Sequence, residues 1–336
     1  MNKRINNNII LLVLAVILFV SCSENKFKID VSDIHINLKI ERLDIDLLAN
    51  YPDTPNVIAL QQKYGNFLDL YSQGVIAIGG MANKAYAHRL LEFNKYCVSN
   101  GLSEKTDSVF KNIDQLQLQL TNAFKHFKYY FPNKEIPEVY TFLSAFNQSV
   151  VTDDGMIGIG LDKYLGRDCI FYKQLGWDNY KIRRMEKEML PVDCMHAWAM
   201  MEFPYKDSID NLLNQMVYEG KIQYFLDAML PETPDSLKFG YTENQMEWAK
   251  YNENKMWAYL VDSETLFTND HLLIRKFIGD APFTQVFQNN SAPRSGVFLG
   301  WRIIHRYMDK HPDVSLKQLM EDDDYQGILN SADYRP

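Results

Sequence analysis

The first 22 residues restrict this chain more than any other feature of its sequence. Lys3 and Arg4 precede an unbroken apolar run over residues 9–20, and the run ends at Ser21 and Cys22 before a polar continuation. From 9 through 20 the run has 12 residues, whereas a helix needs roughly 20 apolar residues to cross a bilayer. A basic start followed by a short apolar run is typical of a secretory signal. We therefore predict that residues 1–21 are a cleaved signal peptide and that the rest of the chain is exported.

The four residues 19–22, Phe-Val-Ser-Cys, resemble a bacterial lipobox. The resemblance implies that Cys22 is acylated and becomes the new N-terminus after cleavage. Each buried methylene of an acyl chain contributes about 0.8 kcal/mol, so two or three chains anchor a protein durably where one is marginal. We expect Cys22 to be the lipid attachment site of a cell-envelope protein that lies on a membrane, inner or outer, without crossing it. The alternative is an ordinary signal peptide with an incidental cysteine.

The charge of the exported part excludes one class of partner. The chain has 35 Lys+Arg and 43 Asp+Glu. Removal of residues 1–21 takes away only Lys3 and Arg4, which leaves 33 basic and 43 acidic residues, a net charge of −10. An acidic body lacks the positive surface with which proteins bind the phosphate backbone. We therefore expect no nucleic-acid partner.

The exported chain shows no sign of division into several domains. No linker rich in Pro, Gly or Ser and no internal repeat interrupts it. We predict an acylated cysteine and tether over residues 22–37 and a single helix-rich domain over residues 38–336. Cys97, Cys169 and Cys194 remain after Cys22, an odd number without a C-x-x-C pair, and we expect them to be buried free thiols.

Apolar residues at spacings of three and four predict amphipathic helices. Such segments are 105–131 before Pro132, 207–230 from a cap at Asp207 or Ser208 to Pro231, and 296–310. The stretches Thr242–Gln245 and Ser315–Gln318 fit the capping box, in which a hydroxyl and a glutamine side chain bond the free amides at a helix start. Two further helices are expected to begin there.

Strand signals are concentrated in one place. Residues 138–152 and 156–162 are β-prone, and Asp153-Asp154-Gly155 stands between them. An Asp-Gly pair between two such runs is a strong hairpin signal. The predicted fold class is therefore mainly α with a small β-hairpin or sheet.

Several segments, taken in order, resemble the gliding motility lipoprotein GldB family of gliding Bacteroidota. Besides the lipobox they are Gly160–Gly166, Met216–Tyr224, Asn252–Trp257, Gly279–Thr284 and Ala292–Trp301. Together they cover nearly the whole exported chain. The resemblance implies a lipid-anchored component of the gliding motility machinery, with other envelope proteins of that machinery as its partners.

A more distant resemblance is to predicted zinc proteases of the gluzincin type. In those proteins a hairpin precedes a helix with the sequence HExxH, and a later helix supplies a glutamate as the third zinc ligand. The two histidines lie one helical turn apart and face the same metal, and the glutamate between them serves as general base. The order of the elements predicted here matches, which implies a degenerate gluzincin-like metallopeptidase architecture.

The segment in the place of that helix lacks most of the catalytic set. His196 stands where the first ligand would be, Ala197 replaces the base, Met200 replaces the second histidine, and Glu219 corresponds to the third ligand. A thioether is a poor zinc ligand, and loss of a general base removes a factor of about 10²–10⁴ in rate. We therefore expect no catalytic residue, no metal and no cofactor. His196 as a core histidine and Glu219 as an ordinary helix carboxylate are the plainer alternatives.

Two functional hypotheses follow from these resemblances. The first is a noncatalytic, lipid-anchored envelope component of the gliding machinery, whose former peptidase cleft now binds or scaffolds. The second is an active envelope zinc metallohydrolase of the gluzincin type, which would need a ligand from elsewhere in the chain.

The membrane anchor yields the first testable prediction. Replacement of Cys22 by Ala should abolish membrane retention, because the sequence offers no other segment with the length and apolarity of an anchor. Fractionation of cells that produce the Cys22→Ala protein, with a high-salt wash, measures this. Variant protein that stays with the washed membranes would contradict anchoring at this residue.

Overall fold

The structure, a computed structural model, describes residues 25–206 and 209–336. The predictions at Cys22 and at the Asp207 or Ser208 cap lie outside these residues. The strands are β1 (Ile40–Arg42), β2 (Glu138–Phe142), β3 (Val150–Asp153) and β4 (Met156–Gly160). The helices are α2 (Leu43–Asp46), α3 (Val57–Leu70), α4 (Tyr86–Ser99), α5 (Leu102–Phe110), α6 (Asp114–Tyr130), α7 (Ile170–Gln174), α8 (Asn179–Ile182), α9 (Leu190–Glu202), α10 (Leu212–Met229), α11 (Asp235–Phe239), α12 (Glu243–Tyr251), α13 (Glu253–Asp262), α14 (His271–Ile278), α15 (Ser295–Lys310), α16 (Leu316–Glu321) and α17 (Tyr325–Ala332). The expected fold class, mainly α with a small sheet, is confirmed.

The sheet has four strands in the order β1-β2-β4-β3. The predicted hairpin is confirmed as β3 and β4, which pair antiparallel with Asp153 opposite Met156 across the Asp-Gly turn. The prediction of one strand over residues 138–152 is wrong, because a loop separates β2 from β3 and β2 pairs with β4 in parallel. The edge strand β1, which no periodicity indicated, adds to β2 in parallel.

The loop between β2 and β3 is held by the buried carboxylate of Asp162. Its two oxygens accept hydrogen bonds from the Ser144 and Phe146 amides at 3.1 and 2.5 Å. Ala145 and Phe146 have φ of 53° and 67°, a conformation that non-glycine residues rarely adopt. Burial raises the pKa of Asp162 to about 6, against the lowering effect of these hydrogen bonds. This turn replaces the continuation of β2 and directs the chain to β3.

The helix signals that depend on local chemistry are confirmed. Thr242 and Ser315 both form complete capping boxes, and the helix predicted over 296–310 is α15. The three cysteines that the structure describes are free and buried, as expected. Within the described residues no helix has the length and apolarity to cross a bilayer.

Two predicted helix boundaries are wrong for physical reasons. The segment 105–131 forms two helices, α5 and α6, because the Asn112 side chain accepts the Asp114 amide at 2.7 Å in a turn that starts α6. The helix predicted over 207–230 begins only at Leu212, where the Asn211 side chain accepts the Asn214 amide at 2.9 Å. Ile209 therefore precedes the helix.

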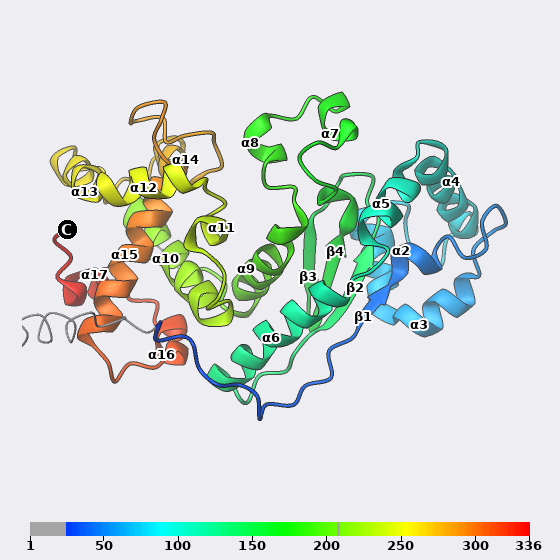
Figure 1. The fold of residues 1–336 in the computed structure, drawn as a ribbon, viewed down its shortest axis with the longest axis horizontal. Helices are drawn as coiled ribbons and strands as arrows, with labels where there is room; N and C mark the ends of the chain where they lie inside the picture. The colour runs from blue at the N-terminus through cyan, green and yellow to red at the C-terminus, as the bar shows by residue number, and fades with distance from the viewer. Residues whose placement is uncertain (1–24, 207–208) are drawn as a thin grey trace, which may run out of the picture.

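Figure 1 shows the sheet with α2 to α4 at one end of the molecule and α10 to α17 at the other, with α6 and α9 between them. Helix α10 is the central element, since every residue in it is buried except Gln215 and Glu219. Its side chains belong to two hydrophobic clusters, one shared with α6, α9 and the sheet and the other with α11 to α15. Packing on α10 thus joins the C-terminal helices to α6, α9 and the sheet.

Helices α10 and α15 meet through two glycines. A Cβ atom placed on Gly220 would overlap the carbonyl group of Gly300, and a Cβ on Gly300 would overlap the carbonyl oxygen of Met216. Backbone therefore touches backbone, a contact that only glycine permits. Glycine inside a helix costs about 1 kcal/mol relative to alanine, and the close approach explains its presence at both positions.

A buried carboxylate joins the same two helices to α11. Asp227 on α10 accepts hydrogen bonds from Trp301 Nε1 at 2.6 Å and from His305 Nε2 at 2.9 Å, and it pairs with the Lys238 ammonium. Burial alone would raise the pKa of Asp227, but the His305 hydrogen bond and the Lys238 charge hold it below its ordinary value. A buried ion with this many partners keeps the three helices in one register.

Residues 25–37, assigned above to a tether, lie against the body in the described structure. Phe27 is 7% exposed and packs edge-on against Tyr224 at 5.0 Å between ring centroids. The Asn25 amide donates to the Pro231 carbonyl at 2.9 Å, and Lys26 pairs with Asp309 at 2.8 Å. From this attachment the segment runs along the molecule to β1 (Figure 1).

The glycine contact yields a stability prediction. Gly300→Ala should lower the free energy of unfolding by about 1–3 kcal/mol, because overpacking forces the helices apart. Gly74→Ala is the matched control, since its Cβ would meet only Leu70 Cδ1 at 3.5 Å. Denaturant melts of both variants measure the difference, and equal stabilities would contradict the close contact.

Candidate functional site

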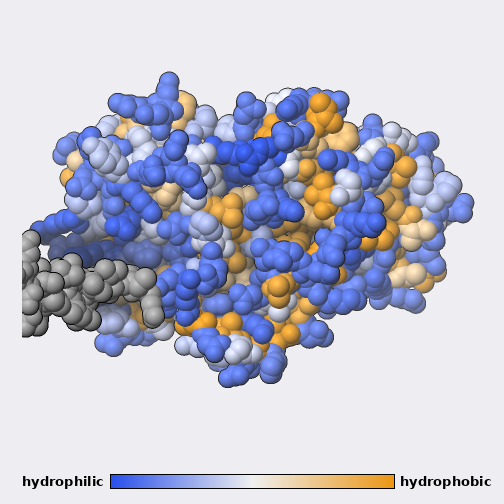
Figure 2. Space-filling view, viewed as in Figure 1, coloured by the Kyte–Doolittle hydropathy of each residue, from blue (hydrophilic) through white to orange (hydrophobic). Residues whose placement is uncertain are grey.

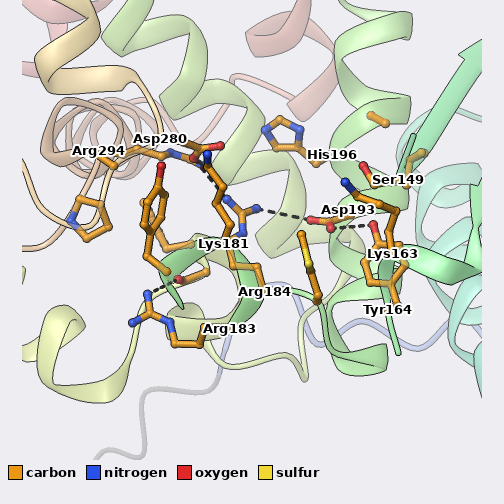
Figure 3. Close-up of a pocket in the computed structure, with 18 residues that line it drawn as sticks. Ser149, Lys163, Tyr164, Lys181, Arg183, Arg184, Asp193, His196, Asp280 and Arg294 are labelled. Atoms are coloured by element: carbon orange, nitrogen blue, oxygen red, sulfur yellow. Dashed lines mark hydrogen bonds and ion pairs between the residues drawn. The ribbon is translucent and has the colours of Figure 1, made fainter. Parts of the chain in front are cut away.

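A cleft with a volume of about 350 Å³ opens between the sheet and the C-terminal helices. Its walls come from the start of β3, from the segment around α8, from α9, and from the two loops that contain Asp280 and Arg294. Figure 3 shows their side chains converging on one space, with His196 and Asp193 projecting from α9. These segments are far apart in the sequence, so the cleft exists only in the folded chain.

The lining of the cleft is basic although the protein is acidic. Five cationic side chains face two carboxylates there; the cations are Lys163, Lys181, Arg183, Arg184 and Arg294, and the carboxylates are Asp193 and Asp280. Figure 2 shows strongly hydrophilic residues over α8, at the mouth of this region. A cleft lined by one sign of charge concentrates ligands of the opposite sign.

Asp193 on α9 lies at the floor of the cleft. It accepts a hydrogen bond from the Tyr164 hydroxyl at 2.8 Å and lies 3.5 Å from Arg184 Nη2. Burial raises the pKa of Asp193, and the charge of Arg184 opposes this effect. The other end of the Arg184 guanidinium reaches Asp280 Oδ1 at 3.4 Å, so Arg184 bridges two carboxylates loosely.

His196 lies in the cleft, one helical turn beyond Asp193. Burial, together with the positive charges of Arg294 and Arg184, lowers the pKa of His196 to about 3. The imidazole is therefore neutral at pH 7. Within the described part of the chain it has no hydrogen-bond partner.

The charge of the same arginine acts on Glu219 of α10. Burial raises the pKa of Glu219, and the charge of Arg294 is the largest influence in the opposite direction. The charges of Arg294 and Asp280 influence the pKa of both His196 and Glu219, but Glu219 is not among the residues that line the cleft. Arg294 is the cation that the two residues share.

The other two residues of the predicted slot differ in position. Ala197 lines the cleft. Met200 is 41% exposed and is not part of the lining. Among residues 25–206 and 209–336, no group of three or more His, Cys, Asp or Glu side chains is arranged to hold a metal ion.

Sequence reasoning missed the residues that give the cleft its charge. Arg184, Asp193 and Arg294 belong to no chemical motif, and tertiary structure alone brings them together. One signal was available, because Arg294 lies in the stretch Ala292–Trp301 that carried the family resemblance. Arg294 has φ 50° and ψ 40°, and strained backbone of this kind gathers at functional sites.

The comparisons with known proteins identify one family. A family model described as gliding motility protein GldB matches residues 24–336. The resemblance found in the sequence segments is confirmed by this match. Neither the curated proteins nor the solved structures include a significant match to the chain.

The electrostatics of the cleft yield a prediction. Arg294→Met should raise the pKa of His196 above about 3 while leaving it below its ordinary value, because a cation is removed and the burial remains. NMR of histidine-labelled protein, titrated downward from pH 7, measures the shift. Arg302→Met, outside the cleft, is the control, and identical titration of His196 in the two variants would show that Arg294 does not act on it.

Proposed function

Because the chain belongs to the gliding motility protein GldB family, we propose that it is a noncatalytic binding component of the gliding machinery, held in the cell envelope by lipid on Cys22. Membership of the family implies a role in gliding motility, and the family is one of lipoproteins. The binding role is assigned to the cleft around His196, with other envelope proteins of the machinery as its partners.

One observation carries the noncatalytic part of this proposal. In an active gluzincin the first histidine and the third-ligand glutamate would flank a zinc dication. Here the positive charge that acts on both corresponding residues, His196 and Glu219, is the guanidinium of Arg294. A second cation, Arg184, also acts on His196. Two fixed positive charges oppose the binding of a dication at that point.

The chemistry of the neighbouring residues agrees with this proposal. Ala197 lines the cleft where a general base would be needed, and a methyl group accepts no proton. Met200 points to solvent instead of into the cleft. The hairpin β3–β4, then α9, then α10 follow in the order of a gluzincin, so we propose a degenerate peptidase architecture that retains the cleft and has lost the reaction.

Complementation separates the binding component from a hydrolase. Glu219→Gln keeps the volume and removes the charge, so it should fold and should restore gliding to a strain that lacks the native protein. Gly220→Leu should lower stability by roughly 1–3 kcal/mol and restore gliding poorly, because the side chain would enter the contact with Gly300. Thermal melts of both proteins accompany the motility assay.

A hydrolase predicts the reverse order. A well-folded Glu219→Gln protein that fails to restore gliding, beside a functional Gly220→Leu protein, would overturn the proposal. Elemental analysis of the native protein adds an independent measurement. One zinc per chain that is lost in both His196→Ala and Glu219→Ala would favour the metallohydrolase instead.

A further inference from the structure

The cations of the cleft differ in how well their own hydrogen bonds are satisfied. Arg183 donates to Gln245 Oε1 at 3.1 Å, and Lys163 lies 4.1 Å from the centre of the Trp177 ring. Lys181 pairs with Asp178 outside the cleft. Because these three cations already have partners, they supply the cleft with positive charge but with few free hydrogen-bond donors.

Arg294 is different, because it is only slightly exposed and almost without partners. Its side chain is 12% exposed, and its nearest carboxylate oxygen, Asp280 Oδ1, lies 3.9 Å away. Within the described residues its guanidinium donates no hydrogen bond, although it carries five N–H donors. Arg184 Nη1 lies 3.4 Å from the same oxygen, which is longer than the usual range of 2.7–3.2 Å for such a hydrogen bond. Two guanidinium groups thus face one position that Asp280 fills poorly.

Side-chain hydroxyls fix the backbone on both sides of Arg294. The Tyr241 hydroxyl donates to the Pro293 carbonyl, and the Thr284 hydroxyl accepts the Ser295 amide at 3.1 Å. Arg294 itself is in the left-handed region at the start of α15. The backbone at Arg294 is therefore fixed, and the planar guanidinium that it carries suits a ligand with two parallel acceptors.

The edge of the sheet lies at the same cleft. Ser149 and Val150 line it, and β3 has no strand on its outer side within the described residues. The Ser149 carbonyl accepts the Gly160 amide, so Ser149 bonds toward β4. Because bonding alternates along an antiparallel strand, the amide and carbonyl groups of Val150 and Thr152 point away from β4. Such groups pair with an added extended peptide.

We propose that this cleft binds an extended peptide segment of a partner protein and that Arg294 and Arg184 clamp a carboxylate of that peptide. The inference rests on the proposed binding role of the cleft and names the chemistry of its ligand. The carboxylate takes the position that Asp280 approaches, and the outer edge of β3 bonds the peptide backbone. Asp193 and Asp280 favour a singly charged carboxylate over a doubly charged phosphate, because two negative charges already lie beside the arginines.

Two matched random pentapeptide libraries test the proposal, one with free C-terminal carboxylates and one amidated. Each library is passed over the immobilised full-length lipoprotein in detergent at low salt, and the retained fraction is sequenced. The wild type should retain peptides, and Arg294→Met should lower the retained fraction at least about tenfold through loss of a charge-assisted contact. Arg302→Met is the control for a lost surface arginine outside the cleft, and thermal melts confirm that both variants fold.

The two libraries distinguish the sources of the carboxylate. Retention of the free-acid library alone indicates a C-terminal carboxylate, and enrichment of Asp or Glu in the amidated library indicates a side-chain carboxylate. The proposal is overturned if the wild type retains no more than Arg294→Met, or if an acidic oligosaccharide such as oligogalacturonate binds through Arg294 and no peptide does. If peptide binding fails while Glu219→Gln still restores gliding, the assignment of a peptide ligand is wrong and the proposed noncatalytic role stands. Cleavage of the retained peptides would instead contradict the noncatalytic role.

Discussion

The contact between Gly220 and Gly300 is the constraint on which the C-terminal half of the structure depends. It brings α10 and α15 together backbone to backbone, without side chains between them. Asp227 then bonds residues of α15 and α11 from the same buried helix. Because Glu219 precedes Gly220 on α10 and Arg294 precedes the first turn of α15, the helix contact also sets where the backbones of Glu219 and Arg294 lie relative to each other. The packing of α10 against α15 therefore also determines the position of the cleft residue Arg294.

The features that sequence predicted correctly are those in which neighbouring residues determine the structure. The capping boxes at Thr242 and Ser315 and the turn at Gly155 each depend on residues within a few positions of one another. The parallel pairing of β1 with β2 joins residues almost a hundred positions apart and left no local signal. The break between α5 and α6 escaped notice because one asparagine turn interrupts an otherwise continuous apolar period.

The same contrast applies to the candidate site: some of its residues belong to a sequence pattern, and others are brought together only by the tertiary structure. His196 and Glu219 were selected by comparison with the gluzincin pattern, and the charge of Arg294 lowers the pKa of both. The arginines themselves come from loops whose positions only the complete fold determines. In the degenerate peptidase architecture proposed above, a side chain would supply the positive charge that a metal brings to an active gluzincin. In such a cleft the charge is permanent and needs no cofactor supply.

The attachment of the N-terminal segment determines how the body would stand on a membrane. Only two residues, Ser23 and Glu24, separate Cys22 from Asn25. The three steps from Cys22 to Asn25 span at most about 3.6 Å each in an extended chain, or roughly 11 Å in total. Asn25 and Lys26 are tied to Pro231 and Asp309. An acyl group on Cys22 would therefore hold the body close to the lipid headgroups and would restrict its rotation relative to the membrane. In Figure 1 the described chain begins beside α16, and α8 lies on the opposite side of the molecule, so lipid on Cys22 would hold α8 away from the bilayer.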